Sequence, residues 1–171
     1  MGGITTYTYN AADQIESIAE AANGIYGKET VTTQYYYRNG RLTTVTDKAG
    51  KDSAYGYDEN GNIQTVKDPN GGTTTYAYDS MHRVTLVTDA LNQTMASYVY
   101  NADGLLEEEK NGRNQKRTYS YDSLGRIQKV KDEEGTITYT YDANGNVETV
   151  KDKNGTITRT YDELNRVKTY T

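Results

Sequence analysis

The 171-residue sequence has no cysteine, no phenylalanine, no tryptophan, one histidine and one proline. Without cysteine, a disulfide framework, a thiolate zinc site and a cysteine nucleophile are all excluded. The single histidine, His82, removes most histidine-based catalytic and metal chemistry. No apolar run approaches the roughly 18 residues that a membrane helix needs, so we expect neither a membrane span nor a signal peptide.

Basic residues are also scarce, because 19 Lys and Arg face 24 Asp and Glu and leave a net charge of −5. Neutralising phosphates requires a basic surface, so we expect no nucleic-acid partner. The large aliphatic residues number 25, a proportion that is typical of disordered chains. The 18 tyrosines and 26 threonines favour β-sheet instead. Composition leaves both states open, and the spacing of the tyrosines must decide.

The tyrosines follow a repeat. A Tyr-x-Tyr-Asp pattern, with Asn or Arg in place of Asp in three copies and Arg159 in place of the first Tyr in the last copy, recurs every 20 to 22 residues after one longer first interval. We call the second tyrosine of each copy the repeat tyrosine; these residues are Tyr9, Tyr37, Tyr57, Tyr78, Tyr100, Tyr121, Tyr141 and Tyr161. Such regular spacing indicates a folded repeat protein and argues against a disordered chain.

The clearest repeats contain two Asp-x-x-Gly quartets about ten residues apart, a pattern typical of type I turns. In other repeats Asn stands at the first position, or Asn, Asp or His at the fourth. The first residue caps the turn with its side chain, and the fourth residue takes a positive φ and forms a bulge. The predicted caps are Asp58, Asp68, Asp79, Asp122, Asp132, Asp142, Asp152 and Asp162. The predicted left-handed positions are Gly61, Gly71, His82, Gly125, Gly135, Gly145 and Gly155.

Counting both quartets in every repeat predicts fifteen turns, one of which ends at Asn23, and therefore about sixteen strands. Between turns, threonine alternates with apolar residues, as at positions 136–141. We predict an all-β fold, one antiparallel meander built from repeats of about 20–22 residues in a curled or spiralling sheet. We expect a single array over residues 1–171: a leader (1–6), an atypical first unit with a longer hairpin or loop (7–34), and regular repeats (35–171), the last truncated.

The strand register is less constrained. If each turn carries one bulge, Val147 lies opposite Tyr141 and Thr149 lies opposite Tyr139. Val150 then falls on the opposite face of the sheet, unless a second bulge intervenes. The shorter connection at Asn39-Gly40 predicts a two-residue hairpin turn.

The full unit, Tyr-x-Tyr-Asp-x-x-Gly-Asn/Arg-Ile/Val, resembles the YD repeat of the RHS family of bacterial toxins, toxin-complex C components and teneurins. The best matches are residues 57–63, 121–127 and 141–147, and the resemblance covers about residues 7–171. It implies a β-sheet that spirals into a hollow shell, which encloses a toxic polypeptide in bacteria or serves adhesion in teneurins. The chain holds about eight repeats, so the resemblance implies a segment of a shell wall.

Other architectures and sites fit less well. A β-propeller needs blades of about 40 residues, here two repeats each, and no blade signature is present. The choline-binding repeat has a similar period but relies on tryptophan, which is absent. The turn at Asp142 superficially matches the start of a calcium loop but lacks the glycine at its sixth position and the glutamate at its twelfth. We therefore expect no metal, no cofactor and no enzyme activity.

The sequence thus favours a non-catalytic wall segment of a shell that encapsulates or presents another polypeptide. The alternative is a carbohydrate or cell-surface binding module that uses rows of tyrosine rings. The expected partners are further copies of the chain at sheet edges or faces, neighbouring repeats of a parent shell, and an enclosed toxin polypeptide or glycans. We expect the parent protein to be secreted or on the cell surface.

Overall fold

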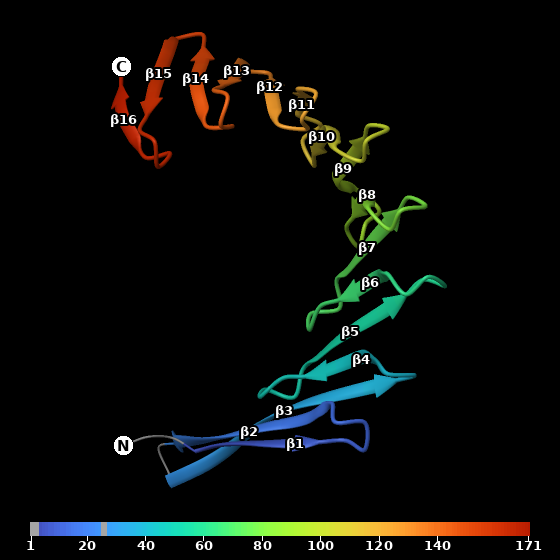
Figure 1. Ribbon diagram of the computed structural model, residues 1–171. Helices are drawn as coiled ribbons and strands as arrows, with labels where there is room; N and C mark the ends of the chain where they lie inside the picture. The colour runs from blue at the N-terminus through green and yellow to red at the C-terminus, as the bar shows by residue number, and fades with distance from the viewer. Residues whose placement is uncertain (1–3, 25–26) are drawn as a thin grey trace. The chain divides into compact units, whose positions relative to one another are not determined.

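The computed structural model describes residues 4–24 and 27–171, and every regular element among them is a β-strand. Sixteen strands pair in chain order in one open antiparallel sheet (Figure 1). The prediction of an all-β meander of about sixteen strands is therefore confirmed. In this described part of the chain, no helix is long and apolar enough to span a membrane.

The chain divides into two compact units, residues 1–83 with 87–93, and residues 84–86 with 94–171. The first unit contains β1 (Thr5–Tyr9), β2 (Ile15–Gly24), β3 (Gly27–Arg38), β4 (Arg41–Thr46), β5 (Asp52–Tyr57), β6 (Ile63–Lys67) and β7 (Thr73–Tyr78). The second contains β9 (Thr94–Tyr100), β10 (Leu106–Asn111), β11 (Lys116–Tyr121), β12 (Ile127–Asp132), β13 (Gly135–Tyr141), β14 (Val147–Asp152), β15 (Gly155–Tyr161) and β16 (Val167–Tyr170). Strand β8 (Val84–Thr88) contributes residues to both units.

One turn type closes most of the hairpins. In the turn between β5 and β6, the amide of Gly61 donates to the carbonyl oxygen of Asp58 (3.1 Å), and the amide of Asp58 donates to that of Asn62 (2.9 Å). Gly61 has a φ of 91°, so a type I turn is followed by a left-handed residue. The same two bonds recur in the turns that begin at Asn10, Asp47, Asp68, Asp79, Asp89, Asn101, Asn111, Asp122, Asp142 and Asp162.

The connection between β3 and β4 is shorter. Arg38 pairs directly with Arg41, and both residues between them, Asn39 and Gly40, have positive φ angles of 51° and 75°. Two successive residues at positive φ define the type I′ turn, which matches the right-handed twist of the strands it joins. The structure therefore has the two-residue turn that the Asn-Gly pair predicts.

Two other glycines differ from the sequence-based prediction. Gly135 and Gly155 have φ angles of 149° and 154°, far from the left-handed values near 60° to 90°. Each glycine pairs directly with the first residue of its turn, Asp132 or Asp152, so only two residues connect the strands. The predicted positive φ is therefore present at both positions, but the predicted bulge is not, because only two residues connect the strands.

The first long hairpin also corrects the sequence analysis. The predicted turn ending at Asn23 is wrong, because β2 continues to Gly24 and Asn23 pairs with Lys28 on β3. The additional residues of the first unit lengthen the two strands to 10 and 12 residues. Strand β1 begins at Thr5, within the stretch expected to be a leader.

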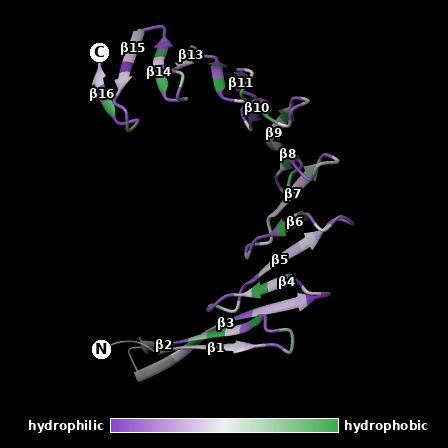
Figure 2. Cartoon of the chain, viewed as in Figure 1, coloured by the Kyte–Doolittle hydropathy of each residue, from purple (hydrophilic) through white to green (hydrophobic). Residues whose placement is uncertain are grey.

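The sheet has no buried core. None of the described side chains is buried, and Tyr7 and Tyr9 are 50% and 58% exposed. Figure 2 shows pale odd-numbered strands such as β3, β5 and β7, which are rich in tyrosine and threonine, beside even-numbered strands such as β4 and β6 with green aliphatic residues. Apolar area is therefore shared between tyrosine rings and neighbouring aliphatic side chains, and each strand contacts only its neighbours in the sheet.

Candidate functional site

The cross-strand register places tyrosines and aliphatic residues on one face, which we call the tyrosine face. On β13 and β14, Tyr141 pairs with Val147 and Tyr139 pairs with Val150. The predicted pairing of Thr149 with Tyr139 is wrong, because a bulge at Glu148 shifts the register between Thr140 and Tyr141. The bulge returns Val150 to the same face as Val147, so both valines pack beside tyrosine rings.

The opposite face carries threonine and lysine, and we call it the threonine face. Thr138 lies between Lys129 and Lys151 on the neighbouring strands. The hydroxyls of Thr140 and Thr149 are 2.7 Å apart, as expected for a hydrogen bond between a cross-strand pair. The sheet therefore presents one face of aromatic and aliphatic groups and one face of hydroxyl and ammonium groups.

The hydroxyl groups of the repeat tyrosines link successive repeats. Each of six repeat tyrosines donates a hydrogen bond to the backbone carbonyl oxygen of a residue in the preceding repeat, 14 to 16 residues earlier. We call this series the tyrosine ladder. Its pairs are Tyr57 with Leu42 (2.8 Å), Tyr78 with Ile63 (2.7 Å), Tyr100 with Val84 (3.0 Å), Tyr121 with Leu106 (2.7 Å), Tyr141 with Ile127 (2.6 Å) and Tyr161 with Val147 (2.7 Å).

The ladder forms where backbone pairing between repeats stops. Strands β6 and β7 pair only from Lys67 and Thr73 to Thr65 and Thr75. Beyond that point the carbonyl of Ile63 has no paired residue on β7, and the Tyr78 hydroxyl donates to it instead. A tyrosine side chain thus replaces one missing backbone hydrogen bond per repeat, which meets the need to pair every backbone carbonyl that is removed from water.

The remaining two repeat tyrosines lie at the start of the series. Tyr37 pairs with Leu42, whose carbonyl oxygen accepts from Tyr57, and Tyr9 pairs with Ile15 on β2. Further along, burial raises the pKa of Tyr78 and of Tyr121 above the ordinary tyrosine value. These hydroxyls therefore keep the proton that the ladder bond requires.

Every predicted turn cap accepts hydrogen bonds from backbone amides. In the turn at Asp122, one carboxylate oxygen accepts from the amides of Leu124 (2.9 Å) and Arg126 (3.0 Å). The other oxygen accepts from Nε of Arg126 (2.7 Å), and this side-chain bond is the main cause that lowers the pKa of Asp122. Equivalent backbone bonds reach Asp58, Asp68, Asp79, Asp132, Asp142, Asp152 and Asp162.

At the fourth position of these turns, the φ angles lie in the left-handed region wherever the turn has the longer form. Gly71 has a φ of 92°, Gly125 of 75°, Gly145 of 88° and His82 of 62°. Histidine adopts this conformation more readily than β-branched residues do. His82 therefore occupies a turn position, and its ring lies 3.1 Å from the Asn62 side chain.

One functional position was not predicted from the sequence, the residue that directly follows the fourth position of each repeat-tyrosine turn. We call it the rim residue. Rim residues contact the next hairpin, at its turn of the same kind or at the repeat tyrosine before that turn. Gln14 donates to the carbonyl of Gly40 (2.9 Å), and the Arg126 guanidinium lies 4.2 Å from the centre of the Tyr141 ring. The alternation of Asn and Arg after glycine in the repeat was the available signal, but its meaning depends on how closely hairpins lie side by side.

Comparison with known proteins identifies this arrangement. A family model described as the teneurin YD-shell matches residues 3–159. The chain belongs to the teneurin YD-shell family. No curated protein matches the chain.

Solved toxin structures share the fold of this YD-shell chain. The pore form of the Photorhabdus luminescens Tc holotoxin, in a mutant of TccC3, gives a TM-score of 0.59 at 16% identity. The TcdB2-TccC3 complex without the hypervariable C-terminal region gives a TM-score of 0.64 at 17% sequence identity, and TcdB2-TccC3-Cdc42 gives a TM-score of 0.61 at 16% identity. Each match covers 97% of this chain and 12% of the other chain. The chain therefore spans about an eighth of the length of these structures, and the likeness shows the fold alone.

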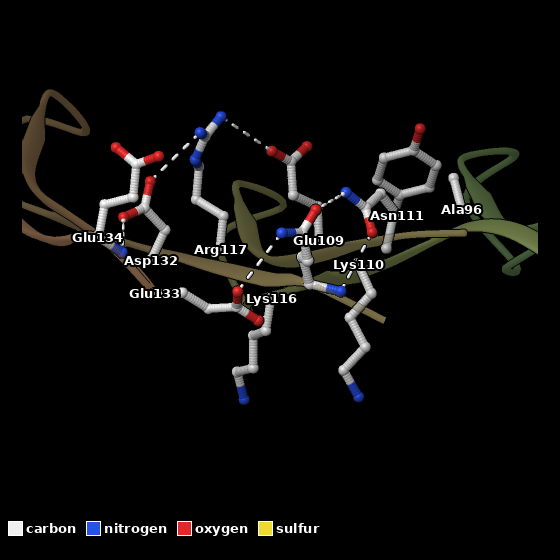
Figure 3. A pocket seen from close by; sticks show the side chains of 11 residues that line it. Ala96, Glu109, Lys110, Asn111, Lys116, Arg117, Asp132, Glu133 and Glu134 are labelled. Atoms are coloured by element: carbon white, nitrogen blue, oxygen red, sulfur yellow. Dashed lines mark hydrogen bonds and ion pairs between the residues drawn. The ribbon is translucent and has the colours of Figure 1, made fainter. Parts of the chain in front are cut away.

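One place on the tyrosine face of this YD-shell chain is charged (Figure 3). Glu109 on β10 pairs with Arg117 on β11, and their side chains are 3.6 Å apart. Arg117 also contacts Asp132 at 3.3 Å, and the Tyr119 hydroxyl donates to Glu109 at 2.8 Å. Burial, followed by the bond to Glu109, raises the pKa of Tyr119. Glu109 stands where other repeats place a valine: Val45, Val66, Val130 and Val150.

These charged groups border an open depression of ≈ 400 Å³. Lys110 and Lys116 lie on the other face, where both contact Glu108 at 3.3 Å and 2.5 Å. In Figure 3 the two lysine side chains point away from Glu109, Arg117 and Asp132. On the tyrosine face, the positive charge of Arg117 therefore lies beside the negative charges of Glu109 and Asp132. In this repeat Glu109 replaces the valine, so the row of aliphatic side chains is interrupted.

We searched the described residues for groups of side chains that could bind a metal ion or act in catalysis. Within them, no group of three or more His, Asp or Glu side chains is placed to hold a metal ion. His82 faces an asparagine amide, and the predicted cap aspartates bind backbone amides of their own turns. The contacts of the tyrosine ladder and of the rim residues bind one hairpin to the next.

Proposed function

We propose that this chain is wall material of a YD shell, a non-catalytic structural segment that encloses or presents another polypeptide such as a toxin. The observation that carries the proposal is the amount of surface that the single layer leaves open. Its solvent-accessible area is 12431 Å², whereas the area scaling of compact monomers gives roughly 8,400 Å² for this size.

The excess of about 4,000 Å² is larger than the 1,200–2,000 Å² buried in a standard protein interface. A sheet with one aromatic face, in which none of the described side chains is buried, therefore needs a further surface to cover it. Further repeats of the shell and an enclosed polypeptide would provide that surface. The solved structures of similar fold are TcdB2-TccC3 complexes, which supports a role in such an assembly. We further propose that the parent protein is secreted or on the cell surface.

A chimaera tests this function. Residues 5–171 would replace the matching repeats of TccC3, and the complex with TcdB2 would be purified and treated with protease. We expect an intact particle in which the C-terminal polypeptide of TccC3 resists the protease, as it should in the parent complex. A particle that assembles but leaves that polypeptide open to cleavage would refute the proposal. An equally long segment with the repeat tyrosines changed to serine is the matched negative control.

The rival function, a carbohydrate or cell-surface binding module, would need accessible tyrosine rings with free hydroxyls. Six of the repeat tyrosines already use their hydroxyls in the tyrosine ladder. We therefore expect no saturable sugar binding by the purified chain on a glycan array. Self-association through the open edges of β1 and β16 is a further expectation, and light scattering at high concentration measures it.

A further inference from the structure

An asparagine rim residue forms side-chain hydrogen bonds both to the aspartate of its own turn and to a side chain of the next turn. The amide nitrogen of Asn62 donates to Asp58 (2.8 Å), which leaves its oxygen facing Nδ1 of His82 at 3.1 Å. The amide nitrogen of Asn146 likewise donates to Asp142 (3.0 Å) and to Oδ1 of Asn165 (2.9 Å). In both cases the partner is the fourth residue of the next turn, and it must carry a polar side chain.

Arginine as a rim residue makes a different contact. Arg126 donates from Nε to Asp122, and its guanidinium lies over the Tyr141 ring beside Gly145. A Cβ atom on Gly145 would stand 3.6 Å from Nη1 of Arg126, so little space remains for a longer side chain. The guanidinium of Arg41 lies over the Tyr57 ring at 5.5 Å.

The next turn after Arg41 is tighter still. A Cβ atom on Gly61 would overlap the guanidinium group of Arg41, so this group would have to shift from its present place over the Tyr57 ring. An arginine rim residue therefore favours glycine at the fourth position of the next turn. An asparagine rim residue is shorter, and it leaves room for a side chain with which it can form a hydrogen bond.

We infer that the rim residue and the fourth residue of the next turn form a matching pair that selects which hairpin can follow which. The sequence obeys this rule throughout. The rim residues Arg41, Arg83 and Arg126 precede turns with Gly61, Gly104 and Gly145, whereas Asn62 and Asn146 precede turns with His82 and Asn165. The two other rim residues, Gln14 and Leu105, precede Gly40 and Gly125.

The rule means that the repeats are not interchangeable, although all share one turn and one tyrosine ladder. A repeat placed after Arg166, whose Nε is held by Asp162 at 2.7 Å, should carry glycine at the fourth position of its turn. Matching does not depend on what the wall encloses, because both residues of each pair belong to neighbouring hairpins of the same chain.

A double-mutant cycle on the full chain tests the rule. Asn62→Arg alone should lower the unfolding midpoint, because the guanidinium and the His82 ring compete for one space. His82→Gly alone removes a hydrogen bond, but Asn62→Arg with His82→Gly recreates an Arg-Gly pair and should restore stability. We expect the unfolding constants to be coupled by at least about threefold in the favourable direction, within the range of contacting residues. Additive effects of the two changes would overturn the inference.

A second double-mutant cycle converts an Arg-Gly pair into an Asn-Asn pair, so the rule can still be tested if Asn62→Arg prevents folding. Arg126→Asn combined with Gly145→Asn recreates the pair seen at Asn146 and Asn165, and each single change is milder. The double variant should be more stable than the sum of the single effects predicts. A mixed control, Asn62→Arg with Gly145→Asn, joins positions from different pairs, and its effects should be additive. Coupling of the same size in the mixed control would also contradict the rule.

Discussion

At the scale of single residues, the turn aspartate performs two tasks with its two carboxylate oxygens. In Asp142, one oxygen accepts from the amides of Asn144 (3.0 Å) and Asn146 (2.8 Å), and the other accepts from the Asn146 side chain (3.0 Å). The aspartate thus holds its own turn closed and also fixes the rim residue. Both tasks favour the ionised carboxylate, so one residue type connects local turn geometry with the packing of neighbouring hairpins.

The pH dependence of stability follows from these bonds. Hydrogen bonds lower the folded-state pKa of seven aspartates: Asp58, Asp79, Asp122, Asp132, Asp142, Asp152 and Asp162. A lowered folded pKa gives stability that is present above the unfolded value, about 4, and is lost as the pH falls through the folded pKa. We expect the thermal midpoint, followed by circular dichroism, to fall as the pH drops below about 4.

Asp142→Asn is the matched variant for this prediction. Asparagine already caps the turns at Asn10 and Asn101, so the variant should fold. It should be less stable at pH 7 but lose less stability on acidification than the unmodified chain. An acid dependence identical to that of the unmodified chain would contradict the account.

A second prediction at this scale concerns Gly71. Its φ is 92°, and no heavy atom lies within 4 Å of the place where a Cβ would stand, so only the backbone conformation resists a side chain. Gly71→Ala should lower the free energy of unfolding by about 1–2 kcal/mol, the cost of a left-handed residue with a Cβ. Gly71→Asn should cost less, because asparagine tolerates this conformation. Urea titration of both variants measures the difference, and equal losses would show that strain is not the cause.

At the scale of the strands, the tyrosine ladder explains how hairpins remain in line after their backbones separate. Tyr141→Phe removes only the hydroxyl that donates to Ile127 at 2.6 Å. We expect the free energy of unfolding to fall by about 0.5–1.5 kcal/mol, the net value of one such bond. Tyr139→Phe, two residues earlier on the same face of β13, is the control and should change stability little. Equal effects at the two sites would mean that the ladder bond contributes nothing specific.

The strand count and most turns could be predicted from sequence, because turn residues act locally and carry their own conformational preference. The register could not be predicted, because it depends on the bulge at Glu148, which no local sequence pattern marks. The bulge places Val150 on the same face as Val147. The first hairpin was misplaced for a related reason. Residues compatible with a turn at Asn23 also fit a strand when the partner strand is long enough to pair with them.

The candidate site was predicted only in part. The repeat tyrosines stood out through their spacing, but their bonds to carbonyls such as that of Ile63 depend on where two strands part. The rim residues and the Glu109–Arg117 pair were missed, because each contact joins different strands of the sheet. Sequence patterns reveal what repeats, whereas contacts between repeats depend on the distance from one hairpin to the next.

At the scale of the whole molecule, stability is a sum of contacts between neighbours, because none of the side chains that the structure describes is buried. The end strands β1 and β16 each have a neighbour on one side only. We expect hydrogen exchange to be fastest in these two strands and slower in strands with two neighbours, such as β5 and β13. Mass spectrometry of exchanged peptides measures this gradient. Uniform protection along the chain would instead indicate one cooperative unit.

The order of the strands also sets how the chain responds to force. Backbone hydrogen bonds in an antiparallel pair run perpendicular to the strands, so they point from each strand to its neighbour in the sheet. A pull along that direction loads the hydrogen bonds of one pair at a time and peels the sheet hairpin by hairpin. A pull along the strands loads all the bonds of a pair together. A wall built this way yields readily at an open edge and resists strongly along its strands.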